Sequence, residues 1–210
     1  MRKIFVVLLL SIPVIGFSQV GIKAGLNFAN VTKASSINSS SHSGFNAGIF
    51  LAPPSKSILS SRTELLFSRQ GYDYKTSTNT GKVTLDYIML PQSMCINITK
   101  YVSLMLGVQM AYLINAKADT TTSSGGSNPY ENIMNFYNRF DYGFGGGAEV
   151  HPYKGLLIGA KYNISLAKLY KDAQSGQMPS FSSIDAKNNL VQIFAGWRFG
   201  KNETKKKKEK

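Results

Sequence analysis

The sequence of 210 residues contains few of the side chains on which metal and redox chemistry depend. It has one cysteine, Cys95, and two histidines, His42 and His151. One cysteine excludes an intramolecular disulfide, even in an oxidising compartment. Two histidines far apart in the chain and one cysteine are also too few ligands for a His/Cys metal site. We therefore expect neither a metal nor a cofactor.

Apolar runs long enough to span a membrane as a helix are missing as well, since such a span needs about 20 residues. The longest run, Ile4–Ile15, follows Arg2 and Lys3. Small residues stand just behind it, at Gly16 and Ser18. This order is typical of a cleavable signal peptide. We predict a signal at 1–18 that is cleaved after Ser18; the alternative is an uncleaved anchor or a buried helix.

Acidic residues are scarce, with 11 against 24 basic ones, and the net charge is +13. The signal contributes two positive charges and the tail 201–210 a net four, so that +7 remains for a single domain at 19–200. Nucleic-acid binding would require basic residues clustered on one face with aromatics between them. Here they are spread singly along the chain. We predict no nucleic-acid partner, and a solvated, disordered basic tail at 201–210.

Extended segments with side chains of alternating polarity dominate the rest of the chain. Leu156, Ile158 and Ala160, for example, alternate with Gly159 and Lys161. A repeat of two residues is that of a β-strand and not of a helix. The alternation predicts eight strands, at about 20–30, 44–53, 59–74, 82–96, 102–116, 139–151, 156–170 and 188–200.

The connections between these segments alternate in length. Segments rich in Ser, Thr, Asn and Gly occupy 31–43, 75–81, 117–138 and 171–187, whereas 53–56, 97–100 and 152–155 are tight turns. Long loops at one end and short turns at the other are typical of outer-membrane β-barrels, whose short turns lie in the periplasm. We therefore predict an all-β fold, an eight-stranded antiparallel up-and-down barrel with a polar, filled lumen.

The two faces of the predicted strands decide between a membrane barrel and a soluble one. In the sixth strand, Phe140, Tyr142 and Phe144 share one face, while Asp141 and Glu149 share the other with several glycines. A narrow lumen suits small or paired polar residues, and aromatics near strand ends suit the membrane boundaries. We therefore predict a cell outer-membrane location in contact with lipid. A soluble lipocalin-like ligand-binding barrel is the alternative.

Three motifs in order resemble a known family. They are Val20–Ala29 (VGIKAGLNFA), Glu64–Gly71 (ELLFSRQG) and Leu85–Pro91 (LDYIMLP), followed by a closing aromatic strand. Together they look like the PorT-like outer-membrane β-barrel family, relatives of the OmpA/OmpX eight-stranded barrels. The resemblance covers nearly all of 20–200 and implies fold and location but no single activity. A founding member of the family is linked to secretion and gliding machinery, which suggests a secretion-complex partner. The chain departs from the family at Met94–Cys95 and in its basic tail.

Catalytic candidates are sparse. Some small outer-membrane barrels modify lipids, and this chemistry needs a histidine near a serine and a carboxylate. His42 has serines beside it, but its carboxylate would have to be Asp119, Glu131 or Asp172 from another loop. His151 is predicted at the opposite end of the barrel. We predict that the protein is not an enzyme; a lipid-modifying outer-membrane enzyme is the alternative.

Charged residues on the predicted inner face form the most informative set. An eight-stranded barrel is just wide enough to be filled by side chains, and charges there must be paired or hydrated. We interpret the set as structural ion pairs, with a substrate or ion path as the alternative. Its members are Lys23, Arg62, Glu64, Arg139, Asp141, Glu149, Lys161 and Arg198.

The third long loop, 117–138, combines a polar tip with an aromatic segment. Aromatic and methionine side chains are enriched where proteins meet partners. The candidate contacts for an envelope or secretion-complex protein are Tyr130, Ile133, Met134, Phe136 and Tyr137. The alternative is that this segment folds onto the barrel as a short helix or extends the sixth strand. The sequence thus predicts a non-enzymatic outer-membrane barrel with a binding, structural or secretion-accessory role.

Overall fold

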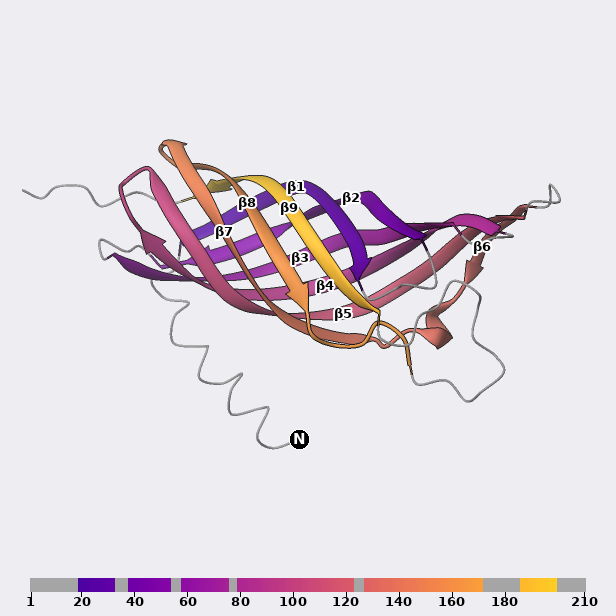
Figure 1. Ribbon diagram of the computed structural model, residues 1–210. Coiled ribbons are helices and arrows are strands. Elements are labelled where there is room, and N and C mark those ends of the chain that lie inside the picture. Colours follow the sequence, from indigo (N-terminus) through magenta and orange to yellow (C-terminus); the bar gives the residue numbers. More distant parts are fainter. Residues whose placement is uncertain are drawn as a thin grey trace, which may run out of the picture.

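The strands of the computed structural model close into a barrel (Figure 1). The structure describes residues 19–32, 38–53, 58–75, 79–122, 127–171 and 186–199, so the predicted signal and tail lie outside the described residues. The strands are β1 (Gln19–Thr32), β2 (Asn38–Ala52), β3 (Leu59–Lys75), β4 (Asn79–Asn97), β5 (Val102–Thr122), β6 (Ser127–Asn132), β7 (Phe140–Tyr153), β8 (Leu156–Ser165) and β9 (Lys187–Arg198). All neighbours are antiparallel; β1 pairs with β9, and β4 with β5, while β6 pairs with β5 alone among the strands of the described ranges. The predicted eight-stranded antiparallel barrel is confirmed, with β6 as an addition outside the ring.

Strand ends differ from the prediction at the end that carries the long loops, called the loop end below. β2 begins at Asn38, six residues before the predicted start, because its serine-rich segment pairs with β3. β5 continues to Thr122 and the chain returns along it as β6, within the segment predicted as a loop. β8 ends at Ser165 instead of residue 170. Ser and Thr form strands readily when a neighbouring strand is available, but they show no apolar alternation.

The barrel wall is much taller on one flank than on the other. β3, β4 and β5 have 17, 19 and 21 residues, whereas β8 and β9 have 10 and 12. A membrane-spanning strand needs about 9–11 residues. The long strands therefore project beyond the barrel at the loop end, where β6 lies beside them (Figure 1). We call this projection of β3–β6 the tall flank.

Short connections close the opposite end, called the turn end. β7 and β8 are joined through Lys154 and Gly155, with Tyr153 opposite Leu156. Gly155 has φ +87°, a conformation that two-residue hairpin turns require and that glycine adopts without steric cost. A matching connection leads from Asn97 to Val102 between β4 and β5.

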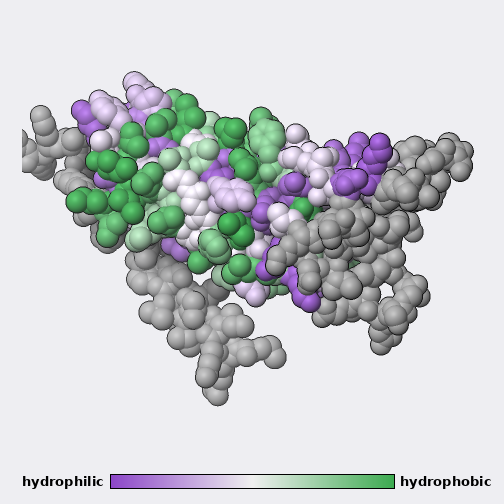
Figure 2. Space-filling model, viewed as in Figure 1, coloured by the Kyte–Doolittle hydropathy of each residue, from purple (hydrophilic) through white to green (hydrophobic). Residues whose placement is uncertain are grey.

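Apolar side chains cover the outside of the barrel. Alternation along β5 exposes Leu104, Leu106 and Val108, and along β9 it exposes Ile193 and Trp197. Figure 2 shows hydrophobic residues over the body of the barrel and hydrophilic residues toward the tall flank. We call this surface the apolar band. Among the described residues, no helix is long and apolar enough to cross a membrane.

The lumen contains three layers of buried side chains. A charged layer lies nearest the turn end, and an amide layer of Asn and Gln residues lies above it. An apolar layer with several tyrosines lies at the loop end. The predicted polar lumen is therefore confirmed for the first two layers, although the charged layer also contains an apolar cluster around Phe50, Met105 and Phe194, and the loop end is largely apolar.

Candidate functional site

Two buried ion pairs form the centre of the charged layer. Arg62 on β3 donates to both carboxylate oxygens of Glu149 on β7, with Nη1–Oε2 2.6 Å and Nη2–Oε1 2.5 Å. Lys23 on β1 donates from Nζ to Oε2 of Glu64 on β3 over 2.8 Å. The side chains of both pairs are at most 2% exposed. A bidentate arginine–carboxylate pair is directional as well as strong, so the first pair fixes β3 relative to β7 across the lumen.

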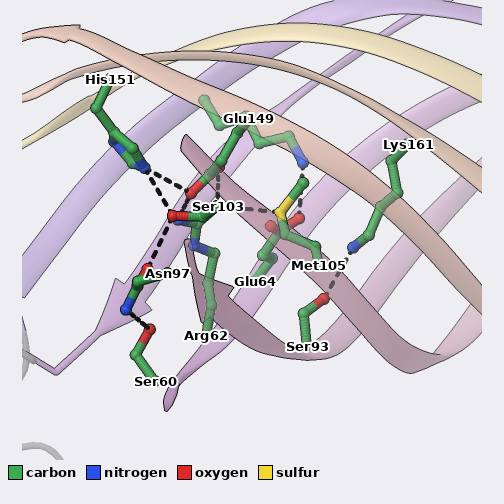
Figure 3. Close-up of polar contacts among 11 residues, drawn as sticks. Ser60, Arg62, Glu64, Ser93, Asn97, Ser103, Met105, Glu149, His151 and Lys161 are labelled. Atoms are coloured by element: carbon green, nitrogen blue, oxygen red, sulfur yellow. Dashed lines mark hydrogen bonds and ion pairs between the residues drawn. The ribbon is translucent and has the colours of Figure 1, made fainter. Parts of the chain in front are cut away.

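His151, Ser103, Asn97 and a third lysine extend the charged layer (Figure 3). His151 Nε2 lies 3.2 Å from Glu149 Oε1, and Ser103 Oγ donates to Asn97 Oδ1 over 2.8 Å. Lys161 on β8 is buried and donates to Ser93 Oγ on β4 over 3.0 Å. Polar contacts therefore reach across the lumen between strands that are not neighbours.

The sequence analysis did not identify two phenylalanines of this layer, Phe50 and Phe194. The Lys23 Nζ lies 3.9 Å from the ring centroid of Phe194, and the Arg62 Cζ lies 5.1 Å from that of Phe50. A desolvated cation is stabilised over an aromatic face. Space for Phe50 comes from Gly21, since a Cβ there would meet the ring at 2.1 Å. Both rings have the same strand parity as lumen residues such as Asn46 and Gln192, which is the signal that could have found them.

The predicted lumen residues do not all lie in this layer. Lys23, Arg62, Glu64, Glu149 and Lys161 are buried there, and Arg198 is half-buried at the turn end. Asp141 lies closer to the loop end and accepts a hydrogen bond from Ser165 Oγ over 2.6 Å. 

Arg139 is a correction to the predicted set. It precedes β7 in a bend, and its side chain is exposed at the loop end. Strand alternation does not extend to a residue before the strand, so its predicted position in the lumen is wrong.

The amide layer is a continuous hydrogen-bond network. Asn46 Nδ2 and Gln192 Nε2 both donate to Asn27 Oδ1, over 2.7 and 3.1 Å. Asn27 Nδ2 in turn donates to Ser68 Oγ over 2.9 Å, and Gln70 Nε2 donates to the same oxygen over 2.9 Å. Buried polar groups that are mutually bonded hold a single arrangement. This layer therefore joins four consecutive strands of the wall, β3, β2, β1 and β9.

Three tyrosines form the centre of the apolar layer. The Tyr72 hydroxyl contacts those of Tyr137, over 2.9 Å, and of Tyr170. The rings of Tyr137 and Tyr170 have centroids 4.9 Å apart. Two loop-end segments, 133–138 and 166–171, pair through the Tyr137–Tyr170 bridge and through Asn138 N to Leu169 O over 3.0 Å. We call this arrangement the tyrosine cap.

The cap decides between the two interpretations of the aromatic segment. Met134–Phe136 forms a 3-10 helix, and Ile133 and Tyr137 are 2% and 0% exposed. Met134 and Phe136 are partly buried against the same apolar cluster. The backbone of Tyr130 is in β6, but its side chain lies outside the described set. Ile133 and Tyr137 cannot contact a partner while they are buried, so for them the partner interpretation is wrong and the folded-down helix is correct.

Burial also shifts the titration of the cap to higher pH. It raises the pKa of Tyr137 well above its ordinary value of 10.0, and it raises the pKa of Tyr170 in the same direction. The reason is desolvation, because a phenolate loses its water shell inside an apolar cluster. Both hydroxyls therefore stay uncharged to a higher pH than an exposed tyrosine and can act as hydrogen-bond donors within the cap.

His42 lies in β2 and not in a loop, contrary to the prediction. Its Nδ1 is 2.9 Å from Asp73 Oδ1 on β3. This carboxylate was not among those considered from sequence, because the start of β2 was predicted too late. No hydrogen bond joins His42 to a serine within the part of the chain that the structure describes. His151 lies at the turn end, so the two histidines do not share a site.

The arrangement supports structural roles more directly than chemistry. The carboxylates of the charged layer are ion-paired. The described residues also contain no group of three His, Cys, Asp or Glu side chains that could hold a metal. Cys95 is buried as a free thiol. These contacts connect opposite walls of a cylinder, and each buried charge of the two pairs has an oppositely charged partner.

Comparisons with known proteins agree with this architecture. The barrel resembles neisserial surface protein A (NspA), with a TM-score of 0.50 and 12% identity over 86% of this chain and 97% of that one. It also resembles Ail, the attachment invasion locus protein of Yersinia pestis, with a TM-score of 0.49 and 19% identity over 87% and 99%. No curated protein matches the sequence. Residues 13–171 match the model of the outer membrane protein beta-barrel domain family. The chain therefore belongs to this family and lies in the outer membrane.

Proposed function

We propose that the protein is a non-enzymatic, non-conducting barrel that anchors a binding surface, the tall flank, outside the cell. The observation that carries the proposal is the contrast between a lumen of three interlocked layers and strands that continue far past the apolar band. In outer-membrane barrels the short turns face the periplasm and the longer loops face outward. The tall flank accordingly projects outward.

Contacts through the lumen support a sealed barrel. The Arg62–Glu149 pair, the amide network and the tyrosine cap lie one above another along the axis. An eight-stranded barrel offers room for side chains but not for an aqueous channel. An ion would have to break buried ion pairs and hydrogen bonds at each level.

A groove on the tall flank supports the binding role. It is an open surface groove with a volume of about 640 Å³. Its lining combines hydroxyl, amide and charged groups, among them Ser40, Asp73, Lys75, Thr80, Lys82 and Asp119. Charged groups of both signs beside the Tyr74 ring suit a ligand with both polar and apolar surface.

Cysteine accessibility in intact cells tests the orientation on which the proposal depends. Lys82→Cys places a thiol in the outward groove, and Lys154→Cys places one in a turn at the opposite end. A membrane-impermeant maleimide should label the first variant in intact cells and the second only after the outer membrane is permeabilised. Native Cys95 is buried and serves as the unlabelled background. The reverse pattern would refute the proposal.

Two finer predictions also remain proposals. The three sequence motifs support a PorT-like subgroup and, with it, a secretion-accessory role. Export through a cleaved signal at 1–18 accords with an outer-membrane location. N-terminal sequencing of the mature protein should give Gln19 as its first residue. The absence of a serine bonded to His42 within the described chain is the reason for proposing a binding role instead of lipid hydrolysis.

A further inference from the structure

The turn-end half of the lumen contains more cations than acids. In the described part of the chain its acids are Glu64 and Glu149, and each acts on more than one cation. Its cations are Lys23, Arg62, Lys161 and Arg198. Four cations and two acids leave a net charge of +2, with His151 counted as neutral. Charge inside a narrow lumen has to be paired or hydrated, so the two acids of the chain do not compensate all four cations.

Arg198 is the cation of this set whose charge has the least compensation. It is the last residue of β9, and it has the same strand parity as Gln192, which is buried in the lumen. Within the described ranges its side chain takes part in no ion pair or hydrogen bond, and its Nε–H is shielded from solvent without an acceptor. Lys161, in contrast, lies in electrostatic range of Glu64. The uncompensated charge is therefore concentrated at Arg198.

Glu149 is the acid that acts on Arg198, but other groups already contact its carboxylate. Both of its oxygens accept hydrogen bonds from Arg62, and His151 Nε2 lies 3.2 Å from Oε1 (Figure 3). The repulsion between Arg198 and Arg62 is larger than the attraction between Arg198 and Glu149. The Arg62–Glu149 pair therefore acts on Arg198 as a cation and not as an anion.

Arg62 holds a second donor of the same kind. Its side chain is 2% exposed, both of its terminal nitrogens donate to Glu149, and its Nε–H has no acceptor within the described chain. Two guanidiniums in electrostatic range of each other therefore each keep one shielded, unpaired N–H. A guanidinium has donors but no acceptor, and a water molecule supplies an acceptor without supplying charge. An anion supplies both.

We propose that a phosphate-like oxyanion from solution binds at the turn-end mouth of the lumen against Arg198, with Arg62 as the second cation. Oxyanions match the planar, forked donors of a guanidinium, and a dianion offsets the net charge of +2. Trp197 and Phe199, on either side of Arg198 in the chain, are exposed on the outer wall, so Arg198 faces the lumen and not the lipid. The site lies at the opposite end of the barrel from the groove and does not depend on it.

Thermal unfolding of the purified full chain in a maltoside detergent measures this binding. Inorganic phosphate, titrated at constant ionic strength, should raise the unfolding temperature of the parent with a saturating dependence on concentration. Arg198→Gln should bind phosphate about tenfold more weakly, which is the effect of one lost charge-assisted donor. The matched control is Lys154→Gln, which removes an exposed cation from a turn at the same end. It should bind within about twofold of the parent, because exposed charges contribute little.

A substitution that removes the cation altogether distinguishes lost binding from misfolding. In phosphate-free buffer Arg198→Met should be at least as stable as the parent, because it removes an uncompensated cation. At saturating phosphate the parent should be the more stable of the two. A parent that is more stable than Arg198→Met in both buffers would overturn the proposal, since its cation would then be compensated within the chain.

Two further results would also overturn it. An equal, linear rise in the unfolding temperature of the parent and of Arg198→Gln would indicate the general stabilising effect of phosphate on folded proteins, with an adventitious ion only. An equal, saturating rise when phosphatidylglycerol replaces inorganic phosphate would assign Arg198 to a lipid headgroup.

Discussion

Glu149 contacts more partners than any single ion pair requires. Its carboxylate accepts two hydrogen bonds from Arg62 and lies 3.2 Å from His151 Nε2. The side chain is 1% exposed. A charge that loses its partner in such a place carries its full desolvation cost. The loss of stability on substitution of Glu149 therefore depends less on the energy of the ion pair than on the cost of leaving Arg62 buried without a counter-charge.

Removal of this carboxylate gives the first prediction. Glu149→Ala should lower the free energy of unfolding by about 3–5 kcal/mol, because Arg62 stays buried without a counter-charge. Urea titration of the barrel folded into lipid vesicles measures the change. Asp119→Ala is the control, since its contact with Lys82 is 4.0 Å long and partly exposed; it should cost at most about 1 kcal/mol.

A double substitution sharpens this test. Arg62→Met/Glu149→Ala removes the stranded cation together with its partner and should recover much of the loss, because apolar groups replace buried pairs at little cost. Equal and small losses for Glu149→Ala and Asp119→Ala would mean that water fills the charged layer.

Residue parity explains which lumen side chains could be predicted. Lys23, Glu64 and Lys161 lie well inside strands, where alternation determines the face. Arg139 lies before its strand, so parity did not apply to it. The ion-pair or hydrogen-bond partner of a lumen side chain could not be predicted from parity, because it depends on the register between strands. The Lys23–Glu64 contact, for example, joins residues 41 positions apart.

At the scale of elements, the tyrosine cap consists of two short segments that would otherwise be solvent-exposed. Ile133 and Tyr137 enter from one segment, and Leu169 and Tyr170 enter from the other. Burial of several apolar side chains of this size contributes about 1.5–3 kcal/mol each. The segments are therefore held by the same apolar cluster that closes the lumen.

The protonation of this cap gives the second prediction. A pKa raised by folding means that the contribution of Tyr137 to stability is complete below about pH 10 and is lost as the pH rises through the raised pKa. Ultraviolet titration of tyrosinate should show a late phase, and the cap should loosen in that range. Tyr137→Phe should remove part of the late phase without changing the earlier one. A titration that is the same in both proteins would contradict this account.

Strand ends at the loop end were the weakest part of the sequence analysis. Ser39–Ser43 and Thr120–Thr122 carry no apolar alternation, and their strands form because adjacent strands supply backbone partners. Pairing between segments that are distant in sequence cannot be predicted from the residue pattern of either segment alone. The same error hid the contact between His42 and Asp73.

At the scale of the molecule, closure rests on the pairing of the first strand with the last, in a wall whose other strands pair in chain order. β1 pairs with β9 over twelve residues, and β4 pairs with β5 over most of their length. The wall thus has no free edge within the apolar band, which a lipid environment requires because it offers the backbone no hydrogen bonds. Signal-like residues, alternation and loop asymmetry were sufficient to predict this architecture from sequence.

The sealed lumen gives the third prediction. Single barrels in planar bilayers should show no steady conductance, since three buried layers block the axis. Deleting the cap alone, for example with Tyr137→Ser/Tyr170→Ser, should leave the barrel closed because the amide and charged layers remain. A stable open pore in the unmodified protein would refute the sealed barrel.

Because the wall is higher on one side than on the other, the barrel is asymmetric about the membrane normal. β5 is 21 residues long and β8 is 10, so polar strand projects beyond the lipid on one side and hardly at all on the other. A neighbour that diffuses laterally meets either a tall polar wall or a low rim flush with the headgroups, depending on its direction of approach. Encounters are therefore governed by rotation of the barrel about the membrane normal as well as by lateral diffusion.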